Sequence, residues 1–166
     1  MLVIICGLPG VGKTTLAKSL APLIDGQVLS TDRIRKELFP SPTYSQLEQR
    51  EVFDAMISAA KNLTDVGTNC ILDATFNREQ SRIEVKNKLG LVDNQFHVIE
   101  CVCQEDIAIS RLESRKNDYS DATVEVYQKM KIIREPVKVE HLTLNTIISP
   151  KENARKAIDY ISKRSM

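Results

Sequence analysis

Residues 1–20 read MLVIICGLPGVGKTTLAKSL, and this stretch decides the fold. The apolar run from Leu2 to Cys6 predicts a buried strand, because it lacks the polar alternation of a half-exposed one. A helical run from Lys13 to Leu23 follows after a short glycine-rich turn. One face of this helix is expected to carry Leu16, Leu20 and Leu23. The order strand, glycine-rich loop, helix is the start of a βαβ unit.

The loop itself, GLPGVGKT at residues 7–14, fits the pattern G-x-x-x-x-G-K-[ST]. Glycines let successive main-chain N–H groups turn toward the phosphates of a nucleotide, and the helix that follows adds its positive end. Lys13 supplies a positive charge and the Thr14 hydroxyl a ligand for Mg²⁺. A glycine-rich turn without a ligand is the alternative, but the strand before the loop and the helix after it favour nucleotide binding. The expected nucleotide-binding residues are Gly7, Pro9, Gly10, Val11, Gly12, Lys13, Thr14 and Thr15.

Short apolar runs alternate with helical patterns along the rest of the chain. Further strands are expected at Gln27 to Ser30, Cys70 to Asp73, Phe96 to Cys103 and His141 to Thr146. Helices are expected from Tyr44 to Val66, from Arg78 to Leu89 and after Ser149, with capping signals at Asn77 with Gln80, at Ser149 with Glu152, and at Gly67 and Gly90. The pattern predicts one α/β domain, residues 1–166, with a parallel sheet.

Composition limits the classes of function. The chain has 166 residues, 42% hydrophobic and 27% charged, with a formal charge of +1. This balance is ordinary for a globular domain and argues against extended binding along a nucleic acid. The first apolar run is too short for a membrane span, so no membrane partner is expected. The four cysteines fall in strand-like runs, which indicates reduced, buried thiols and a cytoplasmic location.

Two aspartates follow predicted strands. Asp73, in CILDAT, is a candidate ligand of Mg²⁺ together with Thr14; its alternative role is to cap the next turn. Its neighbour is Ala74, so the glutamate that activates water in many hydrolysing ATPases is absent at this position. Asp32, in LSTDRIRKEL, is placed at the carboxyl edge of the sheet and is the candidate base that takes a proton from an acceptor hydroxyl.

Arginines complete the candidate site. Arg35 lies three residues after Asp32, on the same helical face, where it can bind an acceptor phosphate or pair with a carboxylate. The alternative is a helix cap at Asp32 with a solvated Arg35. Arg111 and Arg115, four residues apart, precede a polar stretch at about 115–122 that is the candidate lid. Two guanidinium groups suit a triphosphate, although a solvated helix face is the alternative.

With these residues assembled, the chain resembles the small P-loop kinases of the AAA-domain, zeta-toxin-like group, including the kinase domain of polynucleotide 5′-hydroxyl kinases. The resemblance spans nearly the whole chain and rests on GLPGVGKT, STDRIRKEL, ILDATFNREQSR and SRLESR. It implies a three-layer fold with a five-stranded parallel sheet in the order 2-3-1-4-5. It also implies that Asp32 is the general base, Arg35 an acceptor-binding residue, Asp73 a metal or acceptor-side residue, Arg115 a phosphate clamp and Arg111 a nucleotide contact.

The prediction is therefore a kinase that uses ATP and Mg²⁺, with Lys13, Asp32 and Arg115 as catalytic residues. The predicted acceptor is a polynucleotide 5′-hydroxyl, since Tyr44 can stack on a base of a single strand. A basic cleft is expected from Arg33, Arg35, Lys36, Arg78 and Arg82. A nucleoside, a sugar or another small alcohol fits the same residues, and a regulatory module that binds ATP without transferring phosphate is the alternative class. The oligomeric state is left open.

Overall fold

The protein is described by a computed structural model that covers residues 1–114 and 121–165. Five parallel strands form one sheet in the order β2-β3-β1-β4-β5. The strands are β1 (Leu2–Cys6), β2 (Gly26–Ser30), β3 (Asn69–Asp73), β4 (Phe96–Val102) and β5 (Leu142–Asn145). The predicted fold class and strand order are confirmed.

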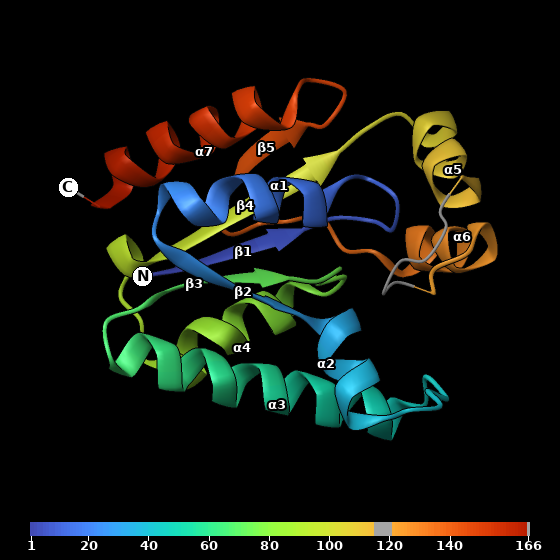
Figure 1. Cartoon of the computed structure of the whole chain (residues 1–166), viewed down its shortest axis with the longest axis horizontal. Helices are drawn as coiled ribbons and strands as arrows, with labels where there is room; N and C mark the ends of the chain where they lie inside the picture. The colour runs from blue at the N-terminus through green and yellow to red at the C-terminus, as the bar shows by residue number, and fades with distance from the viewer. Residues whose placement is uncertain (115–120, 166) are drawn as a thin grey trace.

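Helices cover both faces of the sheet (Figure 1). The helices are α1 (Lys13–Leu20), α2 (Thr31–Leu38), α3 (Gln46–Asp65), α4 (Glu79–Leu89), α5 (Glu105–Glu113), α6 (Val124–Ile133) and α7 (Pro150–Ser165), with 3₁₀ turns η1 (Ala21–Leu23) and η2 (Asp93–Gln95). Helices α1 and α7 lie on one face and α3 and α4 on the other, while α5 and α6 lie beyond the carboxyl ends of the strands. The result is a three-layer sandwich with a core on each side of the sheet.

The strand register places the candidate residues at one edge. Asp73, the last residue of β3, lies beside Ile5 of β1 on one side and Ser30 of β2 on the other. On the far side of β1, Cys6 lies beside Glu100 of β4. Because all strands are parallel, their carboxyl ends share this edge, where ligands bind in open α/β sheets.

Two local predictions are wrong. Helix α1 ends at Leu20, and Leu23 belongs to η1 and is 55% exposed, because Pro22 and the 3₁₀ turn rotate it away from the buried face. The capping box of Asn77 with Gln80 does not form, since α4 begins at Glu79 and has Arg78 at its N-cap position.

Other predicted helix ends are confirmed. Gly90 closes α4 in the left-handed conformation, with φ of 64°. The Ser149 hydroxyl accepts a hydrogen bond from the Glu152 N–H at 3.3 Å, at the start of α7.

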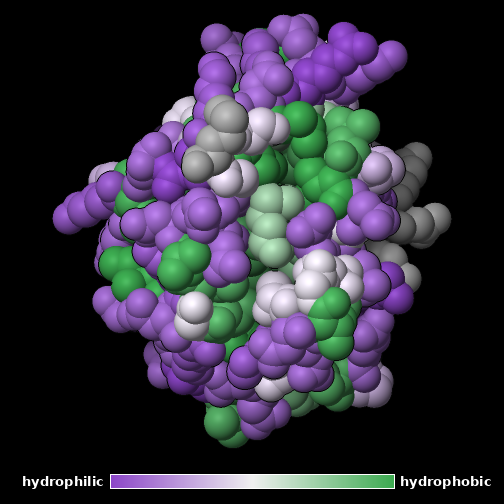
Figure 2. Space-filling view, turned by 90° about the vertical axis from the view of Figure 1, so that its left-hand side faces the viewer, coloured by the Kyte–Doolittle hydropathy of each residue, from purple (hydrophilic) through white to green (hydrophobic). Residues whose placement is uncertain are grey.

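The face where the amino ends of the strands lie is mainly hydrophilic, with hydrophobic side chains in separate patches (Figure 2). Within residues 1–114 and 121–165, none of the helices has the length and apolar character needed to cross a bilayer.

Candidate nucleotide-binding and active site

The turn from β1 to α1 depends on glycine at two positions of the motif. Gly7 has φ of 146°, and a Cβ there would lie 2.4 Å from the Cys101 carbonyl oxygen. Gly12 has φ of 91° and forms the N-cap of α1. Both φ values lie where residues with a side chain are strained, so the motif glycines are required by the shape of the loop.

The remaining loop residues are held by contacts within the loop and with the chain after β5. Pro9, Gly10 and Val11 are buried, and the Val11 carbonyl accepts a hydrogen bond of 2.6 Å from the Thr146 hydroxyl. Lys13 Nζ donates to the Leu8 carbonyl oxygen at 2.9 Å, so its charge lies over the loop. Thr15 is exposed on the first turn of α1. Such a loop at a helix N-terminus is suited to bind phosphate groups.

A carboxylate and a hydroxyl meet directly beside the loop. The Thr14 hydroxyl donates a hydrogen bond of 2.6 Å to Asp73 Oδ2, and Asp73 is buried at the end of β3. Both groups are hard oxygen donors, which Mg²⁺ prefers, and Mg²⁺ usually takes its other ligands from phosphates and water. The described residues contain no cluster of three or more His, Cys, Asp and Glu side chains suited to a metal, so this pair is the candidate Mg²⁺ site within them.

Arg111 of α5 lies on the other side of the loop. Its guanidinium donates to the hydroxyl and to the carbonyl oxygen of Thr146, both at 3.0 Å. A Cβ at Gly12 would lie 3.4 Å from the same guanidinium, so Arg111 contacts the loop closely. This position is compatible with its predicted nucleotide contact. Arg115 and most of the predicted lid at 115–122 lie outside the described residues.

Asp32 lies in the first turn of α2, which begins directly after β2. The N-cap position is held by Ser30, so the alternative reading of Asp32 as a helix cap is wrong. Since β2 is the neighbour of β3, Asp32 comes from the strand next to the Thr14–Asp73 pair. The two aspartates therefore follow adjacent strands at the same edge.

Arg35 is held by a buried carboxylate and is not solvated. Its guanidinium donates to Glu48 Oε1 of α3 at 3.0 Å and lies 4.9 Å from the centre of the Tyr44 ring. Glu48 Oε2 also accepts hydrogen bonds from the Thr43 N–H at 2.6 Å and the Tyr44 N–H at 3.1 Å. Burial alone would raise the pKa of Glu48, but these hydrogen bonds and the Arg35 charge outweigh it and lower the pKa.

Tyr44 and Lys36 meet the end of the predicted lid. The Tyr44 hydroxyl donates to Asp121 Oδ2 at 2.5 Å, and Lys36 Nζ donates to Asp121 Oδ1 at 3.0 Å. Burial and the hydrogen bond to Asp121 raise the pKa of Tyr44 to about 12, so the phenol stays a donor at neutral pH. These contacts join the segment between α2 and α3 to the chain that leads into α6.

The predicted basic cleft is only partly present. Arg78 is exposed at the N-terminus of α4, and its role in substrate binding stays a prediction. Arg82 is fully buried and donates to Glu79 and to the carbonyl oxygens of Phe76 and Pro136, so its place in the cleft was wrong. Sequence alone did not show this, because a helical arginine after a polar start is typical of a solvated face.

Sequence reasoning missed a second arginine near the phosphate loop. Arg134 donates to Glu100 Oε1 at 2.7 Å and to the Thr75 carbonyl oxygen at 3.2 Å. One signal was available, because Glu100 is a charged residue inside the apolar strand β4 and needs a cation as partner.

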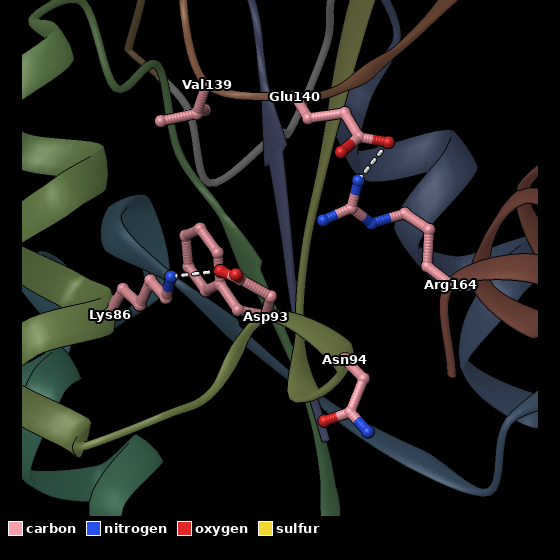
Figure 3. Close-up of a pocket in the computed structure, with 7 residues that line it drawn as sticks. Lys86, Asp93, Asn94, Val139, Glu140 and Arg164 are labelled. Carbon is pink, nitrogen blue, oxygen red and sulfur yellow. Dashed lines mark hydrogen bonds and ion pairs between the residues drawn. The ribbon is translucent and has the colours of Figure 1, made fainter. Parts of the chain in front are cut away.

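One cavity lies at the opposite edge of the sheet. It has a volume of about 480 Å³ and is lined by Lys86, Asp93, Asn94, Phe96, Val139, Glu140 and Arg164. Figure 3 shows its charged groups as two ion pairs, Lys86 with Asp93 and Glu140 with Arg164. Phe96 begins β4, so this cavity lies at the amino edge and does not belong to the candidate site.

The cysteines are reduced, as predicted. Cys6, Cys70 and Cys101 are buried, and Cys103 is partly buried. Burial raises the pKa of Cys70 and of Cys101 to about 12, so neither thiol is activated as a nucleophile at neutral pH.

Comparison with known proteins agrees with this geometry. A family model described as an AAA domain matches residues 2–137. An uncharacterized protein of Mycobacterium tuberculosis is 29% identical over 137 residues, which are 75% of this chain and 28% of that protein. The chain thus spans little more than a quarter of the length of the curated relatives it matches.

Solved structures share the fold at low identity. A sugar kinase from Janibacter sp. HTCC2649 superposes with a TM-score of 0.76 at 13% identity, covering 97% of this chain and 94% of that one. Chaetomium thermophilum Kti12, in complex with ADP-AlF3, has a TM-score of 0.76 at 16% identity and full coverage of both chains. A gluconokinase from Sinorhizobium meliloti 1021 has a TM-score of 0.73 at 12% identity, covering 98% and 92%. This chain belongs to the AAA domain family, and its fold is that of the P-loop kinases.

Proposed function

We propose that this chain is a kinase that transfers the γ-phosphate of ATP to the hydroxyl group of an acceptor, and that residues 1–166 act as one domain. The observation that carries the proposal is the carboxyl edge, where the phosphate loop, the Thr14–Asp73 pair and Asp32 follow three adjacent strands. A hydrolysing ATPase is less well supported, because Ala74 stands where a water-activating glutamate would follow Asp73.

On the nucleotide side, the main-chain N–H groups of the loop and Lys13 would bind the phosphates. Thr14 and Asp73 would hold Mg²⁺, which neutralises charge on the phosphate oxygens when bound. Arg111 would contact the nucleotide, and Arg115 would clamp the transferred phosphate. These residues place the γ-phosphorus and exclude water, which is most of what phosphoryl transfer requires from a protein.

On the acceptor side, Asp32 would orient the hydroxyl and take its proton. As the acceptor oxygen bonds to the γ-phosphorus, the proton moves to the Asp32 carboxylate, and the bond from the γ-phosphorus to the bridging oxygen of ADP breaks. ADP leaves with the bonding electrons. Arg35, held by Glu48, and Arg78 would bind polar groups of the acceptor.

For the acceptor, the charge pairing supports a small polar alcohol. Lys36 is paired with Asp121, Arg35 with Glu48, and Arg82 is buried, so few cations remain to follow a phosphodiester backbone. The similarity to proteins named as a sugar kinase and a gluconokinase supports the same choice. A polynucleotide 5′-hydroxyl is the second candidate, because Tyr44 is 44% exposed and can stack on a terminal base. The buried thiols fit a reducing compartment such as the cytoplasm.

The test is phosphate transfer from γ-labelled ATP to a panel of sugars, nucleosides and 5′-hydroxyl oligonucleotides. Asp32→Asn should lower transfer by about 10²–10⁴-fold and leave ATP binding nearly intact, since only the proton acceptor is removed. Asp65→Asn, the same change at an exposed residue at the end of α3, is the matched control. Unaltered transfer by Asp32→Asn would remove it from the base role. A wild-type protein that binds ATP and labels none of the acceptors would favour a regulatory module instead.

A further inference from the structure

The chain between α6 and β5 is fastened to the segment that follows β3. We call residues 134–140 the strap. The Glu135 N–H donates to the Asn77 carbonyl oxygen at 2.8 Å, and the Val139 N–H donates to Glu79 Oε1 at 2.7 Å. In return, Glu135 Oε2 accepts a hydrogen bond of 2.8 Å from the Glu79 N–H at the start of α4. The strap and the N-terminus of α4 therefore satisfy each other's polar groups.

The buried side chain of Arg82 stabilises the contact between the strap and the segment that follows β3. Its buried guanidinium donates to the Pro136 carbonyl oxygen at 3.0 Å and to the Phe76 carbonyl oxygen. Phe76 has φ of 44°, a conformation that costs energy for a residue with a side chain and persists only where its surroundings fix it. The path of the chain after Asp73 is thus imposed by the strap.

Arg134, the first residue of the strap, extends this contact to the phosphate loop. The Thr75 carbonyl oxygen accepts hydrogen bonds from Arg134 at 3.2 Å and from the Gly7 N–H at 3.3 Å. The other terminal nitrogen of the guanidinium donates a hydrogen bond of 2.7 Å to Glu100 Oε1. The Arg134 and Glu100 side chains are only 12% and 18% exposed, so solvent screens this pair little.

Thr75 lies two residues after the candidate metal ligand Asp73. Between them, the Ala74 N–H donates to the Ile5 carbonyl oxygen at 3.3 Å. The main chain that carries Asp73 is therefore held by its own strand, by the end of β1 and, through Thr75, by Arg134, while the Asp73 carboxylate itself accepts a hydrogen bond from Thr14. Substitution of a group that holds a metal ligand in place typically lowers metal affinity by about 10–100-fold.

We propose that Arg134 is a positioning residue of the metal site: it fixes the Asp73–Thr75 segment against the first residue of the phosphate loop, and so links α6 to the place where Mg-ATP binds. This inference rests on the proposed function, because it assigns Asp73 to the metal. In this role Arg134 acts through the Thr75 carbonyl group rather than as a ligand of the metal.

Two substitutions separate this role from a general ion pair. Arg134→Lys keeps a positive charge beside Glu100, but a single ammonium group lacks the planar fork that serves both Glu100 and Thr75. Glu100→Gln keeps an oxygen acceptor for Arg134 and leaves the contact to Thr75 intact. Arg50→Lys is the matched control, since Arg50 also bridges two carboxylates, Asp54 and Glu84, on the exposed surface of α3.

The measurement is the dissociation constant of ATP with and without Mg²⁺, by titration calorimetry on the full chain. We expect Mg²⁺ to tighten ATP binding in the wild type, and Arg134→Lys to lose about tenfold of this tightening while binding without Mg²⁺ stays nearly constant. Glu100→Gln and Arg50→Lys should keep the tightening. Thermal melts establish that each variant is folded. If Arg134→Lys does not fold, Arg134→Gln replaces it, because glutamine retains a neutral donor for Thr75. Arg134→Gln should lose part of the Mg²⁺-dependent tightening of ATP binding.

The outcomes are distinct. Full Mg²⁺-dependent tightening in Arg134→Lys would overturn the positioning role alone, and so would an equal loss in Glu100→Gln, which would assign the effect to the ion pair. A wild-type protein that binds ATP equally well with and without Mg²⁺ would overturn the proposed function at its metal site, and this inference with it.

Discussion

The phosphate loop on the nucleotide side is shaped mainly by its main chain, whereas the acceptor side is formed by paired side chains. Around the phosphate loop, Gly7 and Gly12 shape the backbone. The Thr146 hydroxyl donates to the Val11 carbonyl oxygen, and the Thr75 carbonyl oxygen accepts from the Gly7 N–H. On the acceptor side, Arg35, Glu48, Tyr44, Lys36 and Asp121 form a network of paired side chains. A short motif therefore predicts nucleotide binding, while the acceptor depends on side chains that a few substitutions can change.

The largest effect on binding is expected at the nucleotide side. Lys13→Met removes the charged donor over the loop, and a hydrogen bond to a charged group contributes about 1.5–3 kcal/mol, so ATP affinity should fall about 10–100-fold. The loss should be the same for every acceptor. Calorimetric titration with Mg-ATP measures it, and Lys18→Met on the exposed face of α1 is the control. An unchanged affinity of Lys13→Met for Mg-ATP would contradict the assignment of Lys13 to phosphate binding.

An intermediate effect is expected from Glu48, which holds Arg35. Glu48→Gln should weaken acceptor binding and lower the melting temperature at pH 7, but leave ATP affinity intact. The pKa of Glu48 lies below its ordinary value of 4.5, so its charge stabilises the fold above that pH, and the contribution is lost as the pH falls through the lowered pKa. The melting difference between wild type and Glu48→Gln should therefore shrink below pH 4.5. Glu51→Gln, exposed on the same helix, should show no such trend.

The smallest effect is expected from Tyr44→Phe, which removes the hydrogen bond to Asp121 and keeps the ring beside Arg35. The cost in stability should be at most about 1 kcal/mol, because the hydroxyl is partly exposed to water. The pKa of Tyr44 is raised from 10 to about 12, so the folded state loses this contribution only as the pH rises above 10. The difference in melting temperature between wild type and Tyr44→Phe should be the same at pH 7 and at pH 8. A large change in this difference between the two pH values would contradict the raised pKa of Tyr44.

Much of the fold could be predicted from the sequence, because its signals are local. The five predicted apolar runs correspond to the five strands, and the motif from Gly7 to Thr14 forms the turn into α1. The pairing of Thr14 with Asp73 also followed, since both come at the carboxyl edge of neighbouring strands.

The parts that could not be predicted depend on contacts between distant segments. Arg82 looked like a surface residue, but the strap, 53 residues away at Glu135, covers it. Arg35 could be assigned an acceptor or a carboxylate, and only the packing of α2 against α3 selects Glu48. Arg134 carried no local pattern at all, because its partners Thr75 and Glu100 lie on other elements.

The most direct test of the central claim is a crystal structure with Mg²⁺ and a non-hydrolysable ATP analogue. We expect the triphosphate to contact the main-chain N–H groups of the loop from Gly7 to Lys13, and the metal to lie at the Thr14 hydroxyl beside Asp73. A nucleotide bound elsewhere, or a loop that holds no phosphate at saturating analogue while Lys13 keeps its hydrogen bond to Leu8, would contradict this expectation.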